Sequence, residues 1–151
     1  MSQVQDIMTR DVITVKKETS IRELAELFTT HRRGTLPVID DLGNLIGVVT
    51  ETDLIERDKS LHIPTVISLF DWVIYLESEK KLEKELKKVT AQTVADIYQA
   101  EVVTVSPVTS ITKVADIMSE KKIHAIPVVE GKRLVGIISR IDLIRSMVRQ
   151  D

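Results

Sequence analysis

The stretch Leu45–Leu54 reads LIGVVTETDL, and a variant of it, LVGIISRIDL, stands at Leu134–Leu143. Each begins with an apolar, β-branched run and continues with a hydroxyl residue that is followed three positions later by an aspartate. The apolar run predicts a strand, and the hydroxyl residue with its carboxylate predicts the first turn of a helix. Two such junctions in one chain of 151 residues indicate an internal repeat.

The repeat continues outward from these two stretches. A shift of 90 positions places Val4–Asp40 on Val94–Glu130, and the identical residues include the Pro-Val pairs that begin at Pro37 and Pro127. After a one-residue deletion, a shift of 89 aligns the two stretches quoted above. Chance does not produce this agreement, so we interpret the chain as two copies of one unit.

Each copy predicts the element order β-α-β-β-α, which makes the fold class α+β. In the first copy the elements are expected at Val12–Val15, Ser20–His31, Leu36–Ile39, Leu45–Val49 and Glu51–Arg57. In the second copy they are expected at Val102–Val105, Ser110–Lys122, Ile126–Val129, Leu134–Ile138 and Arg140–Met147. One copy of about 55 residues has too little core to stand alone, so we expect the two to pack face to face with pseudo-two-fold symmetry.

Between the copies lies an insertion with an unusual concentration of aromatic residues. Phe70, Trp72 and Tyr75 are three of the five aromatic residues in the chain, and a charged helix is predicted after them. Residues 63–76 are open to three interpretations, namely a lid over the chain's own cleft, a dimer contact, or a surface for another protein. The predicted parts are a first repeat at 1–58, the insertion at 59–92 and a second repeat at 93–151.

Composition excludes several classes of function. The net charge of −2 and the pI near 6.0 leave no concentrated basic face for nucleic acid or an anionic membrane. The absence of cysteine excludes disulfides, zinc–thiolate sites and thiol nucleophiles, and is typical of a reducing cytosol. No apolar run is long enough to span a membrane, and the first residues do not resemble a signal peptide. We therefore expect a soluble, cytoplasmic protein.

Nothing in the sequence predicts catalysis or a metal site. The three histidines, His31, His62 and His124, are scattered and have no carboxylate or second histidine at metal-ligand spacing. The chain has only 5 glycines and no glycine-rich phosphate loop. We expect the protein not to be an enzyme.

The tandem unit resembles the CBS domain pair, also called a Bateman module. The resemblance rests on five stretches, which cover both copies at matched positions: Asp6–Thr9, Leu36–Ile39, Leu45–Leu54, Ile126–Val129 and Leu134–Leu143. It implies that an adenosyl ligand binds as a regulatory ligand in a cleft between the copies, whether AMP, ADP, ATP, S-adenosylmethionine or a dinucleotide. No cofactor is required, and the resemblance implies a regulatory module that signals to a separate, unidentified effector protein.

The residues of the two junctions suit such a ligand. Thr50 and Asp53, like Ser139 and Asp142, place a hydroxyl and a carboxylate at a helix N-terminus, where a phosphate and the ribose hydroxyls can be bound. Val48 and Ile137 precede them on the same side of each strand and could flank an adenine. The resemblance adds four further cleft residues, which are Gly34, His124, Thr14 and Thr104.

The two sites are not equivalent in sequence. Arg140 follows Ser139, whereas Glu51 follows Thr50, so the second junction is the better candidate for binding a phosphate. The alternative is that both Thr-x-x-Asp and Ser-x-x-Asp are only helix caps. The protein would then be a structural or interaction module with vestigial, empty nucleotide sites.

By resemblance we also expect a homodimer formed through the helices, and C2 dimers are the commonest oligomers.

Overall fold

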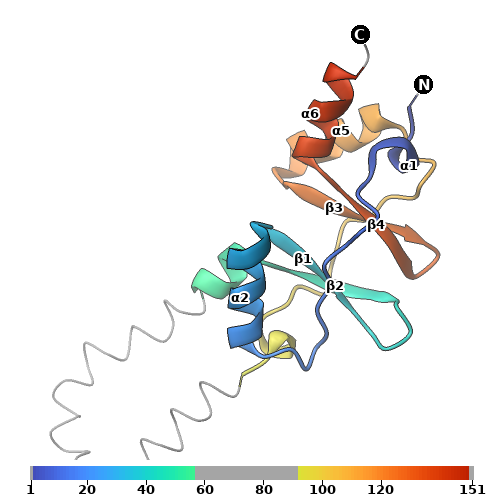
Figure 1. Cartoon of the computed structure of the whole chain (residues 1–151). Helices are drawn as coiled ribbons and strands as arrows, with labels where there is room; N and C mark the ends of the chain where they lie inside the picture. The colour runs from blue at the N-terminus through green and yellow to red at the C-terminus, as the bar shows by residue number, and fades with distance from the viewer. Residues whose placement is uncertain (1, 57–91, 150–151) are drawn as a thin grey trace, which may run out of the picture.

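The structure is a computed structural model that describes residues 2–56 and 92–149. The insertion predicted at 59–92, with Phe70, Trp72 and Tyr75, lies almost entirely outside the described residues. The first part contains α1 (Val4–Ile7), α2 (Ile21–His31), β1 (Thr35–Ile39), β2 (Leu45–Thr50) and a helical segment at 51–56. The second part contains η1 (Val94–Asp96), α5 (Ile111–Lys121), β3 (Ala125–Glu130), β4 (Arg133–Ser139) and α6 (Arg140–Val148). Figure 1 shows two similar units, one above the other.

Each unit is built on an antiparallel hairpin, and the two hairpins match in detail. Pro37 lies opposite Val48 in the first hairpin, and Pro127 lies opposite Ile137 in the second. Both hairpins have a register irregularity one residue further along, after Val38 and after Val128. The predicted repeat, its α+β class and the hairpin strands are confirmed.

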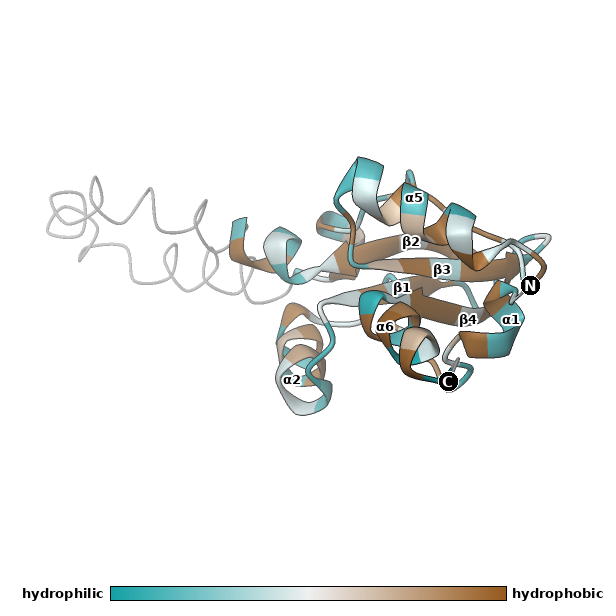
Figure 2. Cartoon of the chain, turned by 90° about the horizontal axis from the view of Figure 1, so that it is seen from above, coloured by the Kyte–Doolittle hydropathy of each residue, from teal (hydrophilic) through white to brown (hydrophobic). Residues whose placement is uncertain are grey.

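The tips of the two hairpins also bond to each other. The Leu45 N–H donates to the Lys132 carbonyl at 2.8 Å, and the Leu134 N–H donates to the Gly43 carbonyl at 3.2 Å. Leu45 and Leu134 are equivalent positions of the repeat, so the two bonds are related by the pseudo-two-fold axis. In Figure 2 the strands at the centre are mostly hydrophobic, and the helices around them carry both hydrophilic and hydrophobic residues.

The strands predicted at Val12–Val15 and Val102–Val105 are wrong. In the first unit only Val15 pairs, through one parallel bridge to Val38, and in the second only Val105 pairs, to Val128. The next rung of the first ladder would need an N–H from the residue after Leu36, which is Pro37. Proline has no N–H to donate, so the parallel ladder stops after one residue. Pro127 has the same effect in the second unit.

Each long helix begins and ends where the sequence predicts. The Ser20 hydroxyl accepts from the Glu23 N–H at 3.1 Å, and the Ser110 hydroxyl accepts from the Lys113 N–H at 3.2 Å, so both serines are N-caps. Both helices end at a left-handed C-cap, which is Arg32 in the first unit and Lys122 in the second. The cationic side chain at each of these ends suits the negative end of the helix dipole.

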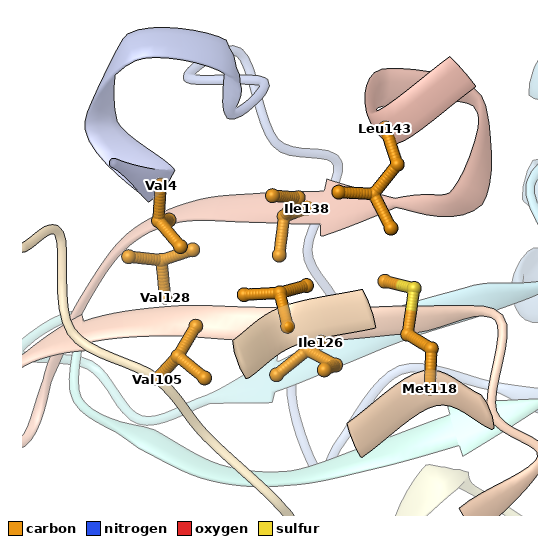
Figure 3. Close-up of a cluster of buried hydrophobic side chains, with 8 residues drawn as sticks. Val4, Val105, Met118, Ile126, Val128, Ile138 and Leu143 are labelled. Carbon is orange, nitrogen blue, oxygen red and sulfur yellow. The ribbon is translucent and has the colours of Figure 1, made fainter. Parts of the chain in front are cut away.

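The two hydrophobic cores do not follow the order of the chain. Val4, from the start of the first copy, is fully buried in the core of the second unit. Val94, from the start of the second copy, is fully buried in the core of the first. In Figure 1, α1 accordingly lies in the unit of β3 and β4, and the yellow η1 lies beside α2. Figure 3 shows Val4 against the core side chains Val105, Met118, Ile126, Val128, Ile138 and Leu143.

The crossing segments also pair with the opposite hairpin. Thr9 exchanges two backbone hydrogen bonds with Ile137, at 2.8 and 2.9 Å, and so adds a rung to β4. Gln99 exchanges two with Val48, at 2.8 and 3.0 Å, and adds the equivalent rung to β2. Each unit therefore needs a piece of the other copy to complete both its core and its sheet.

Candidate functional site

A cavity of about 1190 Å³ lies between the two units. The paired residues of both hairpins line it, with Pro37 and Val48 from the first and Pro127 and Ile137 from the second. Small-molecule sites typically measure about 300–1,000 Å³ and combine apolar walls with a few polar groups. This cavity has room for a nucleotide and walls of the expected kind.

Most of the predicted site residues meet at this cavity, although they come from distant parts of the chain. Eight of them line it, which are Gly34, Val48, Thr50, His124, Ile137, Ser139, Arg140 and Asp142. Thr14, Thr104 and Asp53 do not line it. Next to the two threonines, Ile13 and Val103 line the cavity instead. Successive side chains of an extended segment point to opposite sides, which separates each threonine from its apolar neighbour.

The Ser139–Asp142 junction has the geometry of a capping box. The Ser139 N–H donates to Asp142 Oδ2 at 2.9 Å, and the Asp142 N–H donates back to Ser139 Oγ at 3.3 Å. The Ser139 hydroxyl also donates to Oδ2, at 3.0 Å. Asp142 is only 6% exposed, yet it lines the cavity, and it belongs to the first turn of α6, near the helix N-terminus.

The Thr50–Asp53 junction repeats the same cap. The Thr50 N–H donates to Asp53 Oδ2 at 2.8 Å, and the Asp53 N–H donates to Thr50 Oγ1 at 3.2 Å. Both motifs therefore cap helices, as the alternative interpretation of the sequence requires. A cap occupies chiefly one oxygen of each carboxylate, and the other oxygen remains an acceptor for a further donor.

Backbone hydrogen bonds join the remaining predicted residues to these helix starts. The Arg140 N–H donates to the His124 carbonyl at 3.0 Å, and the Glu51 N–H donates to the Gly34 carbonyl at 3.1 Å. Ser139 is followed by Arg140, whereas Thr50 is followed by Glu51, and both of these residues line the cavity. Further cations line it on both sides, with Arg32 and Arg33 before Gly34 and Lys122 before His124. The difference that favours an anionic ligand group at the second junction is therefore the residue directly after the cap.

The structure adds site residues that the sequence analysis missed. Thr9, Gln99 and Arg145 line the cavity, and the first two reach it only because their segments cross to the opposite unit. The sequence shows that Thr9 and Gln99 are equivalent under the 90-residue shift. It does not show that their segments cross to the opposite unit, because the shift is the same whichever unit a segment packs against.

The chain consists of two pseudo-symmetric units, each a hairpin with helices, and one cavity lies between them. These features place it in the class of tandem-repeat modules that share a central cleft. Within that class, the model of the CBS domain matches residues 4–60 and 94–149. The chain belongs to the CBS domain family and contains a pair of CBS domains.

Relatives of the chain cover nearly all of it. It is 33% identical to protein MJ1404 of Methanocaldococcus jannaschii over 148 residues, which are 95% of this chain and 31% of that protein. It is 30% identical to the chloroplastic CBS domain-containing protein CBSX2 of Arabidopsis thaliana over 155 residues, 97% of this chain and 63% of that protein. The chain therefore spans about a third of the first relative and somewhat under two thirds of the second.

Two solved structures of similar chains contain adenosyl ligands. The crystal structure of CBSX2 in complex with AMP has a TM-score of 0.77 and 27% identity, covering 99% of this chain and 98% of that one. The CBS domain pair of protein MJ0100, in complex with 5′-methylthioadenosine and S-adenosyl-L-methionine, has a TM-score of 0.69 and 26% identity. The match covers 97% of this chain and 99% of that one.

Two features are absent from the described residues, 2–56 and 92–149. Among them, no helix combines the length and the apolar character needed to cross a bilayer. In the same part of the chain, no three histidine or acidic side chains are grouped as metal ligands would be.

Proposed function

We propose that the chain is a non-catalytic regulatory module that binds an adenosyl ligand between its two CBS domains and signals its occupancy to a separate effector protein. The proposal rests on Asp142, which lines the cavity and whose carboxylate retains an acceptor oxygen, Oδ1, outside the cap. The complexes of similar chains with AMP and with S-adenosylmethionine support the ligand class. AMP, ADP, ATP and S-adenosylmethionine all share the adenosine part that this site would bind.

Each part of an adenosine nucleotide has a matching group in the cavity. Asp142 Oδ1 would accept from the ribose hydroxyls, because a carboxylate is a strong acceptor for a vicinal diol. Ile137 and Val48 would pack against the faces of the base. Arg140 and the Ser139 hydroxyl would bind the phosphate, where the N-terminus of α6 adds its partial positive charge.

Ligand binding should stabilise the fold. At 100 times Kd, a ligand specific for the folded state adds about 2.7 kcal/mol, which corresponds to a rise in Tm of about 5–11 °C for a chain of this size. We expect such a rise, measured by thermal unfolding, with at least one of AMP, ADP, ATP and S-adenosylmethionine. Ribose 5-phosphate, which lacks the base, is the control and should leave Tm unchanged.

The same measurement separates the two candidate functions. If none of the four adenosyl compounds raises Tm and calorimetry detects no heat of binding, the clefts are vestigial. The capping boxes would then have only a structural role, and the chain would be an interaction module.

We also propose that the module is a homodimer. Five large apolar side chains are more than half exposed on α6 and on the equivalent helix at 51–56: Ile55, Ile141, Ile144, Met147 and Val148. Ile55 and Ile144 are equivalent positions of the repeat, so these two exposed residues are related by the pseudo-two-fold axis. A patch of this kind on a small protein usually marks a contact, and a C2 dimer would cover it twice.

Sedimentation velocity at micromolar concentration tests the dimer. We expect a dimer for the natural chain and a monomer for Ile144→Asp, which would place an unpaired charge in the contact. The exchange of an exposed apolar residue in the turn between β1 and β2, Leu42→Asp, should leave the dimer intact. A natural chain that sediments as a monomer would rule out this assembly.

A further inference from the structure

Thr9 and Gln99 occupy the same position in the two copies but are chemically different. Each lies on a crossing segment and pairs through its backbone with the opposite hairpin, Thr9 with Ile137 and Gln99 with Val48. The crossing places each side chain beside the aspartate of the helix that follows that hairpin. Thr9 therefore contacts Asp142, and Gln99 contacts Asp53.

The two aspartates differ in how fully their oxygens are occupied. The Gln99 amide donates from Nε2 to Asp53 Oδ1 at 2.9 Å and to Oδ2 at 3.1 Å, while Oδ2 also accepts from the Thr50 N–H. Both oxygens of Asp53 thus have a well-placed donor. Within the described residues, Asp142 Oδ1 accepts only from the Thr9 hydroxyl, at 3.3 Å, which is long for a bond between oxygens.

The cavity wall shows the same difference. Gln99 lines the cavity and Asp53 does not, so at this junction the cavity is bordered by the residue that bonds to the carboxylate rather than by the aspartate itself. At the other junction Thr9 and Asp142 both line the cavity. A ribose would meet a carboxylate at one junction and a glutamine side chain at the other.

We propose that Gln99 blocks the Thr50–Asp53 half of the cavity, so that each chain binds one adenosine nucleotide, at Ser139–Asp142. This inference rests on the proposed function and assigns Gln99 as the residue that sets the number of occupied sites. A ribose at Asp53 must displace the amide from the carboxylate and gains no acceptor that is not already in use. The Gln99 side chain is exposed, so it would block the site by competing with a ribose for the Asp53 carboxylate and not by rigid steric exclusion.

Exchanging the two residues tests the proposal on the full chain, with AMP as the probe in titration calorimetry. The natural chain should bind one AMP per chain. Gln99→Thr, which installs the residue of the other copy, should bind two, and Gln99→Ala should do the same because it also frees Asp53. Thr9→Gln, which adds an amide beside Asp142, should weaken the original site at least tenfold.

The outcomes separate this inference from the function on which it rests. A natural chain that binds two AMP, or Gln99→Thr and Gln99→Ala variants that still bind one, would overturn the role of Gln99 and leave the nucleotide function standing. If neither the natural chain nor these variants bind AMP, the proposed AMP site itself is wrong. The two Gln99 variants decide the matter even if Thr9→Gln fails to fold, which its thermal unfolding curve without ligand would reveal.

Discussion

Gly47→Ala is expected to destabilise the chain by about 3 kcal/mol, a fall in Tm of about 6–12 °C. A Cβ at this position would lie 2.5 Å from Cδ2 of Tyr98 and would overlap the carbonyl oxygen of Gln99. The carbonyl belongs to the backbone of the crossing segment, which two hydrogen bonds hold against β2. The clash can be relieved only if that segment moves away from the hairpin.

Gly34→Ala is the matched control. Its added Cβ would meet only Cδ of Glu51, at 3.9 Å, which is ordinary contact. Its stability should stay within about 0.5 kcal/mol of the natural chain, as for most exposed substitutions. Urea unfolding followed by circular dichroism measures both variants. Equal stability of Gly47→Ala and Gly34→Ala would show that the crossing segment does not pack on β2 as described.

Gly136 is the equivalent of Gly47 in the second copy, and its contacts explain why both Leu45–Leu54 and Leu134–Leu143 contain a glycine at this position. A Cβ on Gly136 would meet Sδ of Met8 at 2.7 Å and the Thr9 carbonyl oxygen at 3.0 Å. Each glycine therefore lies where a segment of the other copy crosses the hairpin. The two CBS domains form one interdependent structure, and their shared cavity is built by the same crossings.

Much of this fold could be predicted because its signals are local. The apolar run at Leu45–Val49 and the caps at Ser20 and Ser110 depend only on residues close in sequence, and the repeat is visible when the chain is aligned with itself. The hairpin pairing followed because the two strands of each unit are joined by a short turn. Eight of the predicted site residues reach one cavity for the same reason, since each belongs to a hairpin, directly precedes one, or belongs to the helix that follows it.

The remaining features depend on contacts between distant residues. Val4 packs in the unit of the second copy, and no pattern near Val4 distinguishes that unit from its own. The β-branched run at Val12–Val15 has the composition of a strand, but its pairing partner contains Pro37, which limits the ladder to one rung. The sequence predicted the Asp142 junction as the better phosphate site because of Arg140, but the contact between Gln99 and Asp53 depends on the crossing and could not be predicted.

Asp142→Ala should weaken AMP binding by about 10- to 100-fold. The substitution removes the acceptor for the ribose hydroxyls, and hydrogen bonds to a charged group contribute about 1.5–3 kcal/mol. Asp53→Ala removes a carboxylate that Gln99 already occupies, so it should change the affinity by less than about threefold. Both substitutions remove a helix-capping carboxylate, so the two variants lose comparable stability and each serves as the structural control for the other.

Titration calorimetry of AMP into the natural chain, Asp142→Ala and Asp53→Ala, at a temperature at which all three are folded, tests most directly whether an adenosyl ligand binds at Ser139–Asp142. We predict one AMP per natural chain, nearly the same affinity for Asp53→Ala, and a loss of at least tenfold for Asp142→Ala. An Asp142→Ala variant that binds AMP as tightly as the natural chain, or a larger loss in Asp53→Ala, would contradict the site.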